Sequence, residues 1–310
     1  MLTMWMARAV VMLNLAHMRE NMLRGRNVMD ITGRTALVTG ANRGLGRHLA
    51  QQLRDRGAKV YAGARNPQSV DLEGVTPIAL DITDPTSVAT AADAAGDVSI
   101  LINNAGISTG TSLLTGDLAN IRREFDTGFF GTLSVIRAFA PQLGAHEGSA
   151  VLNILSGLSW ISFPQAGAYC AAKSAEWSLT NALRLELAPQ GTRVSALHVG
   201  YMDTDLVRRI EAPKADPADI ARIALDGIEA DSYEIIADEP ARAVLARLSG
   251  GVAALYPQLR ALPGFLPGQG ASKPESGSGL VSGLLVAEDA FDDFGVLGRP
   301  GSEVPGRGVD

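Results

Sequence analysis

Cysteine and histidine are scarce in this chain, and their scarcity excludes two kinds of site. One cysteine, Cys170, stands among 310 residues, so no disulfide can form within the chain. A single cysteine is typical of a reducing compartment, and we predict a cytoplasmic location. The four histidines (17, 48, 146 and 198) are too scattered to match the ligand spacing of zinc sites. The sequence therefore predicts no catalytic metal.

Positive charge and long apolar runs are also lacking. Lys and Arg total 27 against 33 Asp and Glu, which gives a net charge of −6. That balance disfavours a nucleic-acid or anionic membrane surface, so we predict neither as a partner. Residues 1–18 are rich in apolar side chains, but Arg8, Asn14 and His17 interrupt them. The stretch is too short and too polar for a membrane span, and no cleavage site of a secretory signal follows it.

The chain nevertheless has enough apolar residues for a sizeable core. Hydrophobic residues make up 46% of the sequence, and strand-like and helix-like patterns alternate from residue 34 to about residue 248. This alternation is typical of one α/β domain with a parallel sheet. We assign residues 30–260 to that domain.

Both ends differ from the domain in composition. We expect residues 1–29 to be a flexible or amphipathic extension, unless Met29 is the true start. In residues 261–310, 16 of the 50 residues are Gly or Pro, a composition that favours a disordered tail. The apolar stretch at 283–298 is the exception, and it either docks on a folded surface or stays solvated.

A glycine-rich loop follows the first strand of the domain. Residues 34–40 form a short apolar run, and TGANRGLG at 39–46 leads into a helix with leucines on one face. Strand, glycine-rich turn and helix place backbone N–H groups and the positive end of a helix dipole at an anionic phosphate. Glycine is needed because a side chain would hold a pyrophosphate away. The loop predicts a dinucleotide site, the alternative being a strand–helix turn without a ligand.

Two arginines indicate which dinucleotide would bind. In dinucleotide folds the end of the second strand, here 58–64, meets the adenine ribose, where a carboxylate binds a 2′-hydroxyl and an arginine suits a 2′-phosphate. Arg65 follows this strand and Arg43 lies within the glycine-rich loop, with no carboxylate beside them in sequence. A guanidinium binds a phosphate bidentately. The pair favours NADP(H) over NAD(H), unless both arginines are solvated surface residues.

Tyr169 and Lys173, in the run YCAAK, are spaced to share one helix face, one turn apart. The ammonium favours the phenolate and is expected to lower the tyrosine pKa from its usual value near 10 toward neutrality. A tyrosine with such a pKa is a general acid/base. Taken alone, such a pair is more often a surface pair. Ser156, thirteen residues before Tyr169, would alone be more often a turn cap.

With these motifs in this order, the chain resembles the classical short-chain dehydrogenase/reductase family, of the NADP-preferring type, from about residue 30 to about residue 257. The matching segments are TGANRGLG (39–46), LDIT (80–83), NNAG (103–106), NILSGLS (153–159), YCAAK (169–173) and VGYMDT (199–204). The resemblance implies a Rossmann-type, doubly wound parallel sheet in a single domain. It also implies homodimers or homotetramers formed through the helices expected at 117–143 and 168–188.

The resemblance carries a set of site residues onto this chain. The implied catalytic residues are Ser156, Tyr169 and Lys173. The implied cofactor-binding residues are Gly40, Asn42, Arg43, Gly44, Leu45, Gly46, Arg65, Asp81, Ile82, Asn103, Ala105, Gly106, Tyr169, Lys173, Met202 and Thr204.

Two positions depart from the family's pattern. Gly128 stands where the family usually has an asparagine that supports a proton relay behind the lysine, and Val199 stands where it usually has a proline. Glycine keeps the backbone carbonyl but loses the side-chain hydrogen bonds, and it costs about 1 kcal/mol in a helix. The relay is therefore in doubt, and Gly128→Asn is predicted to raise turnover.

The predicted function is NADP(H)-dependent interconversion of a carbonyl and an alcohol on a small-to-medium apolar substrate. Candidates for an apolar pocket wall are Leu158, Trp160, Ile161, Phe163, Tyr201 and Met202, the alternative being that several are simply core. The rival is a catalytically weak NADP-binding regulator on the same fold, which Gly128 supports. An epimerase or dehydratase of the extended branch is disfavoured by the loop spacing, and a hydrolase by the lack of a G-x-S-x-G elbow around Ser156.

Overall fold

A seven-stranded, fully parallel sheet forms the centre of the molecule in this computed structural model, which describes residues 29–208 and 210–261. The strand order is β3-β2-β1-β4-β5-β6-β7, so the chain reverses its direction of travel between β1 and β4. The strands are β1 Thr35–Thr39, β2 Lys59–Ala64, β3 Thr76–Ala79, β4 Ile100–Asn103, β5 Ala150–Ile154, β6 Arg193–His198 and β7 Glu234–Ile236. This is the predicted Rossmann-type doubly wound sheet, and the predicted fold class is confirmed.

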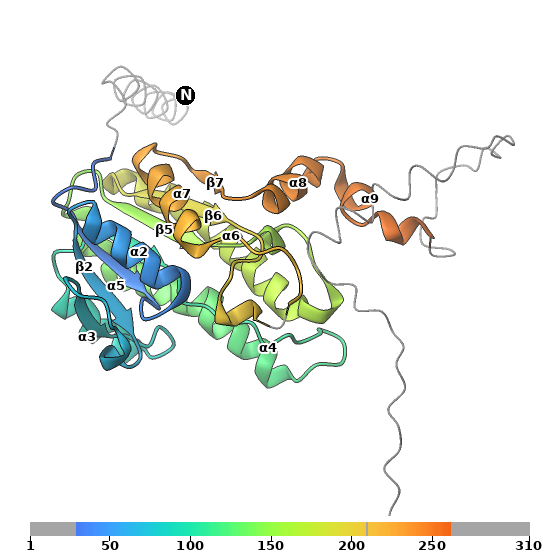
Figure 1. Cartoon of the computed structure of the whole chain (residues 1–310), viewed down its shortest axis with the longest axis horizontal. Coiled ribbons are helices and arrows are strands. Elements are labelled where there is room, and N and C mark those ends of the chain that lie inside the picture. Colours follow the sequence, from blue (N-terminus) through green and yellow to red (C-terminus); the bar gives the residue numbers. More distant parts are fainter. Residues whose placement is uncertain (1–28, 209, 262–310) are drawn as a thin grey trace, which may run out of the picture.

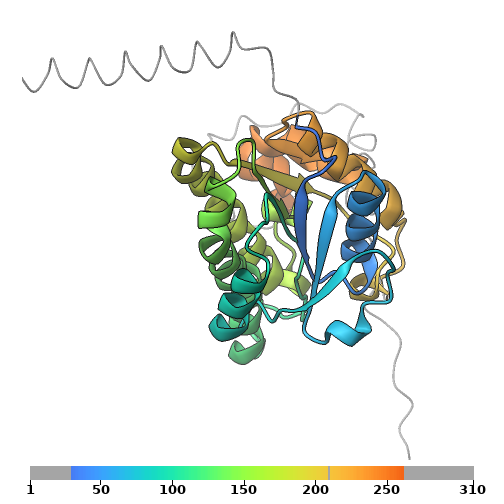
Figure 2. The ribbon, with the colours of Figure 1, turned by 90° about the vertical axis from the view of Figure 1, so that its left-hand side faces the viewer.

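Helices cover both faces of the sheet, and Figure 2 shows the strands between two helical layers. On one face α2 packs against α7, and on the other α5 packs against α3 and α6. Beyond β7, α8 and α9 lie at one end of the molecule (Figure 1). The helices are α2 Gly44–Asp55, α3 Pro85–Ala94, α4 Leu118–Phe125, α5 Thr132–Gly144, α6 Gly167–Leu187, α7 Pro217–Glu229, α8 Glu239–Leu248 and α9 Gly251–Leu255, with short 3-10 turns η1 Pro67–Ser69, η3 Gly157–Ser159, η4 Pro164–Ala166, η5 Ala188–Gln190, η6 Asp205–Val207 and η7 Pro257–Ala261.

Amphipathic helix faces build the core between these layers. Leu45, Leu49 and Leu53, the leucines predicted to share one face of α2, are each at most 4% exposed. They pack with residues of β1, β2 and α7 in one cluster, while α3, α5 and α6 close a second cluster on the other face. Burying one such leucine stabilises the fold by about 1.5–3 kcal/mol.

Aspartates fix where four of the helices begin. Asp84, Asp117, Asp216 and Asp238 each accept a hydrogen bond from a backbone N–H in the first turn of α3, α4, α7 and α8. A cap of this kind contributes about 1 kcal/mol, and it sets the direction in which the helix leaves its loop. The helices therefore return to the sheet in a defined register.

The helix predicted at 117–143 is interrupted by a π-helical segment. Residues Asp126–Gly131 (η2) join α4 to α5 with a widened turn. Gly128 and Gly131 lie buried on its inner side, and a Cβ at Gly131 would stand 2.9 Å from the Ile82 Cδ1. A π segment inside a helix shifts the faces on either side of it relative to each other. Here it turns Gly128 toward α6.

The expectations for residues 1–28 and 262–310, including the stretch at 283–298, lie outside the described residues. Met29, the alternative start, is described and is 5% exposed, packed in the same cluster as Ile31. In the part of the chain that the structure describes, no helix is long and apolar enough to cross a membrane.

A hydrogen-bonded pair of the buried His198 and the partly exposed Glu234 links β6 to β7 beneath Ser156. His198 is fully buried, with its Nδ1 3.2 Å from the Ser156 carbonyl oxygen and its Nε2 2.7 Å from the Glu234 Oε2. Arg184 Nη1 donates to the other carboxylate oxygen of Glu234 at 2.8 Å. Burial raises the pKa of Glu234, but the hydrogen bonds and charges of His198 and Arg184 outweigh it, so the pKa is lowered overall.

This lowered pKa predicts a pH-dependent loss in a Glu234→Gln variant. A carboxyl with a lowered folded-state pKa stabilises the fold above its unfolded value of 4.5, and the contribution is lost as the pH falls through the folded value. At neutral pH we expect the variant to lose about 1 kcal/mol of unfolding free energy, because a partly buried charge-assisted contact is removed. Thermal unfolding from pH 7 to well below pH 4.5 measures the difference. A gap between the two proteins that does not narrow with acid would contradict this role of Glu234.

Candidate functional site

The carboxyl ends of β1 and β4 meet at the point where the strand order reverses. Thr39 Oγ1, at the end of β1, accepts hydrogen bonds from the backbone N–H groups of Asn104 and Ala105, both at 3.0 Å. Asn104 Nδ2 donates in turn to the carbonyl oxygens of Thr39 at 2.9 Å and of Gly40 at 3.2 Å. The two loops are thereby locked together at the place where doubly wound sheets bind ligands.

The glycine-rich loop forms a tight cradle at this point. Gly40 and Gly44 have φ angles of +66° and +52°, a region that side-chain-bearing residues rarely adopt. A Cβ on Gly46 would lie 2.5 Å from the Asn104 Nδ2 and closer still to the Gly40 carbonyl oxygen. No side chain caps the start of α2 at Arg43. Uncapped helix N–H groups above a glycine cradle suit the phosphates of a dinucleotide.

Polar and charged groups surround the side of the loop expected to face the adenosine. Arg43 Nη1 donates to Asp205 Oδ2 at 2.9 Å, across to the turn η6, and Asn42 Nδ2 donates to Ser69 Oγ at 3.1 Å. Arg65 is exposed. Hydrogen bonds from Thr83 lower the pKa of Asp81, and the charge of Arg65 acts in the same direction. Arg43 and Arg65 are thus both exposed at the surface.

Three predicted cofactor residues have buried side chains. Leu45 packs in the core at 4% exposed, and Ile82 packs against the π segment at 7% exposed. Asn103 Nδ2 donates to Asn153 Oδ1 at 2.9 Å between β4 and β5. The side chains of Leu45 and Ile82 are therefore part of the core, and a cofactor role stays a prediction for their backbone groups. The side-chain amide of Asn103 thus links two neighbouring strands through its Nδ2. Its Oδ1 lacks a hydrogen-bond partner within the described residues.

The loop after β6 reaches back over the cradle. A Cβ on Gly44 would stand 3.4 Å from the Thr204 Cγ2, so two predicted residues 160 positions apart lie in contact. Met202 forms an isolated parallel bridge with Ala215 that clamps the base of this loop. Ala105 and Gly106 follow Asn104 in the loop after β4. The glycine-rich loop therefore lies between the loop after β4 and the loop after β6.

Ser156 lies at the end of β5, where it caps the turn η3. Its Oγ accepts a hydrogen bond from the Leu158 N–H at 3.1 Å and donates to the Val199 carbonyl oxygen at 3.3 Å. Ser156 is therefore a turn cap, as the alternative from the sequence held. Because η3 packs on α6, the cap also fixes the serine beside that helix. Val199 is buried, and it acts through a carbonyl that a proline would also supply, so this departure preserves the contact.

Tyr169 and Lys173 lie one turn apart on α6, with the Lys173 Nζ 6.0 Å from the centre of the Tyr169 ring. Lys173 is 8% exposed, and its ammonium donates to the Ile154 carbonyl oxygen and to Glu176 Oε2, both at 2.7 Å. The surface-pair alternative is therefore wrong for this lysine. Burial raises the pKa of Tyr169, and the Lys173 charge lowers it without outweighing burial. The pKa of Tyr169 is therefore raised overall and not lowered toward neutrality as expected, and the Lys173 ammonium is shared with Glu176.

The family of the chain follows from comparison with known proteins. Residues 34–215 match the family model described as short chain dehydrogenase. The chain belongs to the short-chain dehydrogenase family. The predictions of this family and of an oxidoreductase are confirmed, since relatives named as dehydrogenases and reductases share the same sequence core.

Individual relatives of this short-chain dehydrogenase differ in the cofactor they hold. A solved short chain dehydrogenase from Burkholderia cenocepacia J2315, in complex with NADP, is 36% identical with a TM-score of 0.72, covering 74% of this chain and 99% of that chain. One from Burkholderia phymatum, in complex with NAD, is 25% identical with a TM-score of 0.63, covering 71% and 93%. The D-erythrulose reductase of Gallus gallus is 33% identical over 206 residues, 64% of this chain and 83% of that protein.

The predicted apolar wall of this dehydrogenase is largely packed. Leu158, Trp160, Ile161 and Phe163 are each at most 8% exposed and form one core cluster. Trp160 stacks on His198 with ring centres 3.9 Å apart. These side chains therefore support the turn at Ser156 from behind, and Tyr201 and Met202 are the partly exposed members of the predicted set.

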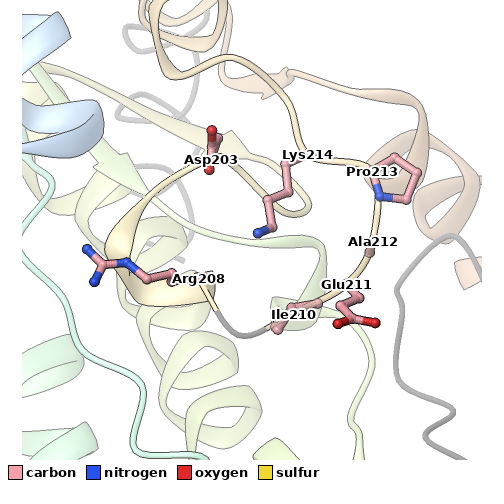
Figure 3. Close-up of a pocket in the computed structure, with 7 residues that line it drawn as sticks. All are labelled: Asp203, Arg208, Ile210, Glu211, Ala212, Pro213 and Lys214. Atoms are coloured by element: carbon pink, nitrogen blue, oxygen red, sulfur yellow. The ribbon is translucent and has the colours of Figure 1, made fainter.

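A hollow of about 650 Å³ lies within the loop after β6 instead. Its lining is formed by Asp203, Arg208, Ile210, Glu211, Ala212, Pro213 and Lys214. Figure 3 shows the two arms of the loop facing each other, with the Lys214 side chain pointing between them. The hollow is charged, open and built from one loop, so it borders the site rather than containing the Tyr169 chemistry.

Sequence reasoning missed four residues that the structure brings to the site. Thr39 and Asn104 tie the two strand ends together, and Glu176 and Thr132 stand behind Lys173. Asn104 was within a recognised motif, but the partner of each side chain is set only by the fold. Within 29–208 and 210–261, no cluster of three or more His, Cys, Asp or Glu side chains is placed to hold a metal ion.

Proposed function

We propose that this dehydrogenase is an NADP(H)-dependent oxidoreductase that interconverts a carbonyl and an alcohol on a small-to-medium apolar substrate. The observation that carries the proposal is the buried Lys173 ammonium, held one helical turn from Tyr169 and tied to the end of β5, two residues before Ser156. A bound nicotinamide dinucleotide would supply the hydride donor or acceptor. The protein's own residues then handle the proton and the substrate oxygen.

Three side chains divide that work. In reduction, Tyr169 donates its phenolic proton to the carbonyl oxygen, and in oxidation it accepts a proton from the alcohol. Lys173 lowers the free energy of the phenolate through its charge, which opposes the effect of burial. Ser156 would turn its hydroxyl proton from the Val199 carbonyl oxygen to the substrate oxygen, while the hydrogen bond from the Leu158 N–H keeps its Oγ in place.

Preference for NADP(H) rests on Arg43 and Arg65. Both are exposed at the adenosine side of the cradle. A relative with 36% identity was solved with NADP, which supports the same preference here. Because a charge-assisted contact to a phosphate is worth roughly a tenfold change in affinity, we expect Arg43→Gln and Arg65→Gln each to weaken NADPH binding about tenfold.

Fluorescence titration with NADPH and NADH measures this preference. NADH binding is expected to stay within about twofold, since NADH lacks the 2′-phosphate. Arg222→Gln on α7, which removes an exposed arginine paired with Asp226, is the matched control. An equal loss for both dinucleotides would contradict the assignment of these arginines to the 2′-phosphate.

Assembly into homodimers or homotetramers is part of the proposal. Leu118, Phe130 and Leu185 of α4, the π segment and α6 are 63%, 56% and 78% exposed. Large apolar side chains that remain exposed on neighbouring helices are typical of a protein–protein surface. Light scattering of the purified protein measures the mass, and a monomer would contradict this part of the proposal. A cytoplasmic location also remains a prediction.

A panel of aldehydes and ketones tests the activity. NADPH oxidation is followed for each compound, and NADPH binding is measured in the same samples by fluorescence. Turnover with apolar members of the panel supports the proposal. NADPH binding without turnover on any member would favour the regulator, which the missing asparagine at Gly128 supports. Failure to bind either dinucleotide would overturn both.

A further inference from the structure

A buried carboxylate stands directly behind the lysine of the site. Glu176 is 2% exposed and lies one turn beyond Lys173 on α6. Its Oε2 accepts from the Lys173 Nζ at 2.7 Å, and its Oε1 accepts from the Thr132 Oγ1 at 3.2 Å. An N–O separation of 2.7 Å is that of a charge-assisted hydrogen bond. Glu176 therefore binds the Lys173 ammonium from the helical turn that follows Lys173, whereas Tyr169 lies on the turn that precedes it.

The same carboxylate occupies the space beside Gly128. A Cβ on Gly128 would stand 3.8 Å from the Glu176 Oε2 and 3.8 Å from the Ala172 Cβ. The π segment brings Gly128 to this position, since it turns the glycine toward α6. A side chain with two or three heavy atoms beyond the backbone at residue 128 would reach the volume that the carboxylate fills. The missing side chain and the buried acid are thus neighbours.

We propose that Glu176 is a positioning residue of the Tyr169–Lys173 site, whose carboxylate holds the Lys173 ammonium from α6 and fills the volume beside Gly128. The inference rests on the proposed function, because it concerns how the same acid/base pair is held. It explains how the site tolerates glycine at 128. It also makes the pair 128 and 176 exchangeable in principle.

The charge of Glu176 acts on both partners of the acid/base pair. Burial lowers the pKa of Lys173, but the Glu176 carboxylate, together with the charges of Tyr169 and Glu124, raises it overall. Glu176 also raises the pKa of Tyr169. The other groups that act on Tyr169 within the described chain are Glu124 from α4 and the Cys170 thiol on α6. Tyr201, from the loop after β6, is coupled to Tyr169 as well.

Titration of the tyrosine distinguishes positioning from simple packing. In Glu176→Gln the shape is kept and the negative charge is removed, so the Tyr169 titration should move to lower pH. Ultraviolet difference spectroscopy measures it, with Tyr169→Phe identifying the signal. Glu186→Gln, the same change at an exposed position of α6, is the control and should leave the titration unchanged. An unshifted titration in Glu176→Gln would overturn the inference.

A swap of the two positions tests exchangeability. Glu176→Ala is expected to lower kcat roughly tenfold to a hundredfold, because the ammonium loses its fixed position. Adding Gly128→Asn should restore at least about a third of the lost activity, since the amide oxygen reaches the vacated volume. The single variant Gly128→Asn is expected to bring no gain, because Glu176 already fills that space; this replaces the gain predicted from the sequence. A double variant no better than Glu176→Ala would overturn the inference.

The failure of this inference and that of the proposed function remain distinguishable. NADPH binding and the tyrosine titration need no substrate, so they report on Glu176 even where turnover is low. An intact NADPH affinity with an unshifted Tyr169 titration would overturn the role of Glu176 alone. A chain that binds no dinucleotide would overturn the proposed function.

Discussion

Replacing Tyr169 by phenylalanine is expected to remove nearly all turnover while NADPH binding stays within about twofold. The ring and its packing in the cluster behind Ser156 remain, and only the hydroxyl that we propose exchanges a proton with the substrate oxygen is lost. Positioned proton transfer contributes about a hundredfold to ten-thousandfold to rate. Lys173 keeps its contacts to Ile154 and Glu176 in this variant, so the site around the missing hydroxyl should stay intact.

Steady-state NADPH oxidation and fluorescence titration on the same preparation measure the two quantities. Tyr233→Phe is the matched control, since Tyr233 is 64% exposed and lies near β7. It should retain the activity of the unaltered protein. Retained turnover in Tyr169→Phe would contradict the assignment of the general acid/base.

Gly46→Ala is expected to lower dinucleotide affinity by at least about a hundredfold. The added methyl would collide with the Gly40 carbonyl oxygen and with the Asn104 side chain, which are backbone and a hydrogen-bonded amide rather than free ends. The start of α2 must move away from β1, and the cradle opens. Overpacking of this kind also costs about 1–3 kcal/mol of stability.

NADPH titration and thermal unfolding separate these two effects. Gly44→Ala provides a milder second variant, because a Cβ there meets only the Thr204 methyl at 3.4 Å, although its φ of +52° adds strain. Gly96→Ala, at an exposed position with open space, is the control. Unchanged affinity in a folded Gly46→Ala protein would contradict the assignment of this loop to the cofactor.

Strands and helices with a regular spacing of apolar residues could be predicted from the sequence. The strand at 34–40, the leucine face of the following helix and the strand at 58–64 appear as β1, α2 and β2. Each is determined by local periodicity and by glycine punctuation, which tertiary packing reinforces. The turn alternative for Ser156 was also visible in sequence, and the structure shows that capping and proximity to α6 occur together.

Contacts between distant segments were not predictable in the same way. Glu176 follows Lys173 by three positions, a spacing that in a sequence suggests a surface ion pair. The π segment packs against α6 at this point and buries the glutamate. The apolar run around Trp160 suggested a substrate wall, but its periodicity cannot tell a pocket from a core. His198 behind Trp160 decides the matter, since the stacked pair fills that space.

The two departures from the family's pattern have different consequences. Val199 preserves the carbonyl that accepts from Ser156, so it needs no compensation. Gly128 removes a side chain, and the nearest polar group to its vacant direction is the Glu176 carboxylate. Gly128 is therefore the departure for which we propose that another residue, Glu176, compensates.

Transfer of deuterium from NADPH labelled at the nicotinamide C4 tests the central claim most directly. Purified protein is mixed with the labelled cofactor and an aldehyde or ketone that supports turnover, and the alcohol is analysed by mass spectrometry. The account predicts one deuterium on the carbinol carbon, formed by the unaltered protein and absent with Tyr169→Phe. Binding of NADPH without any transfer to the panel of carbonyl compounds would contradict it.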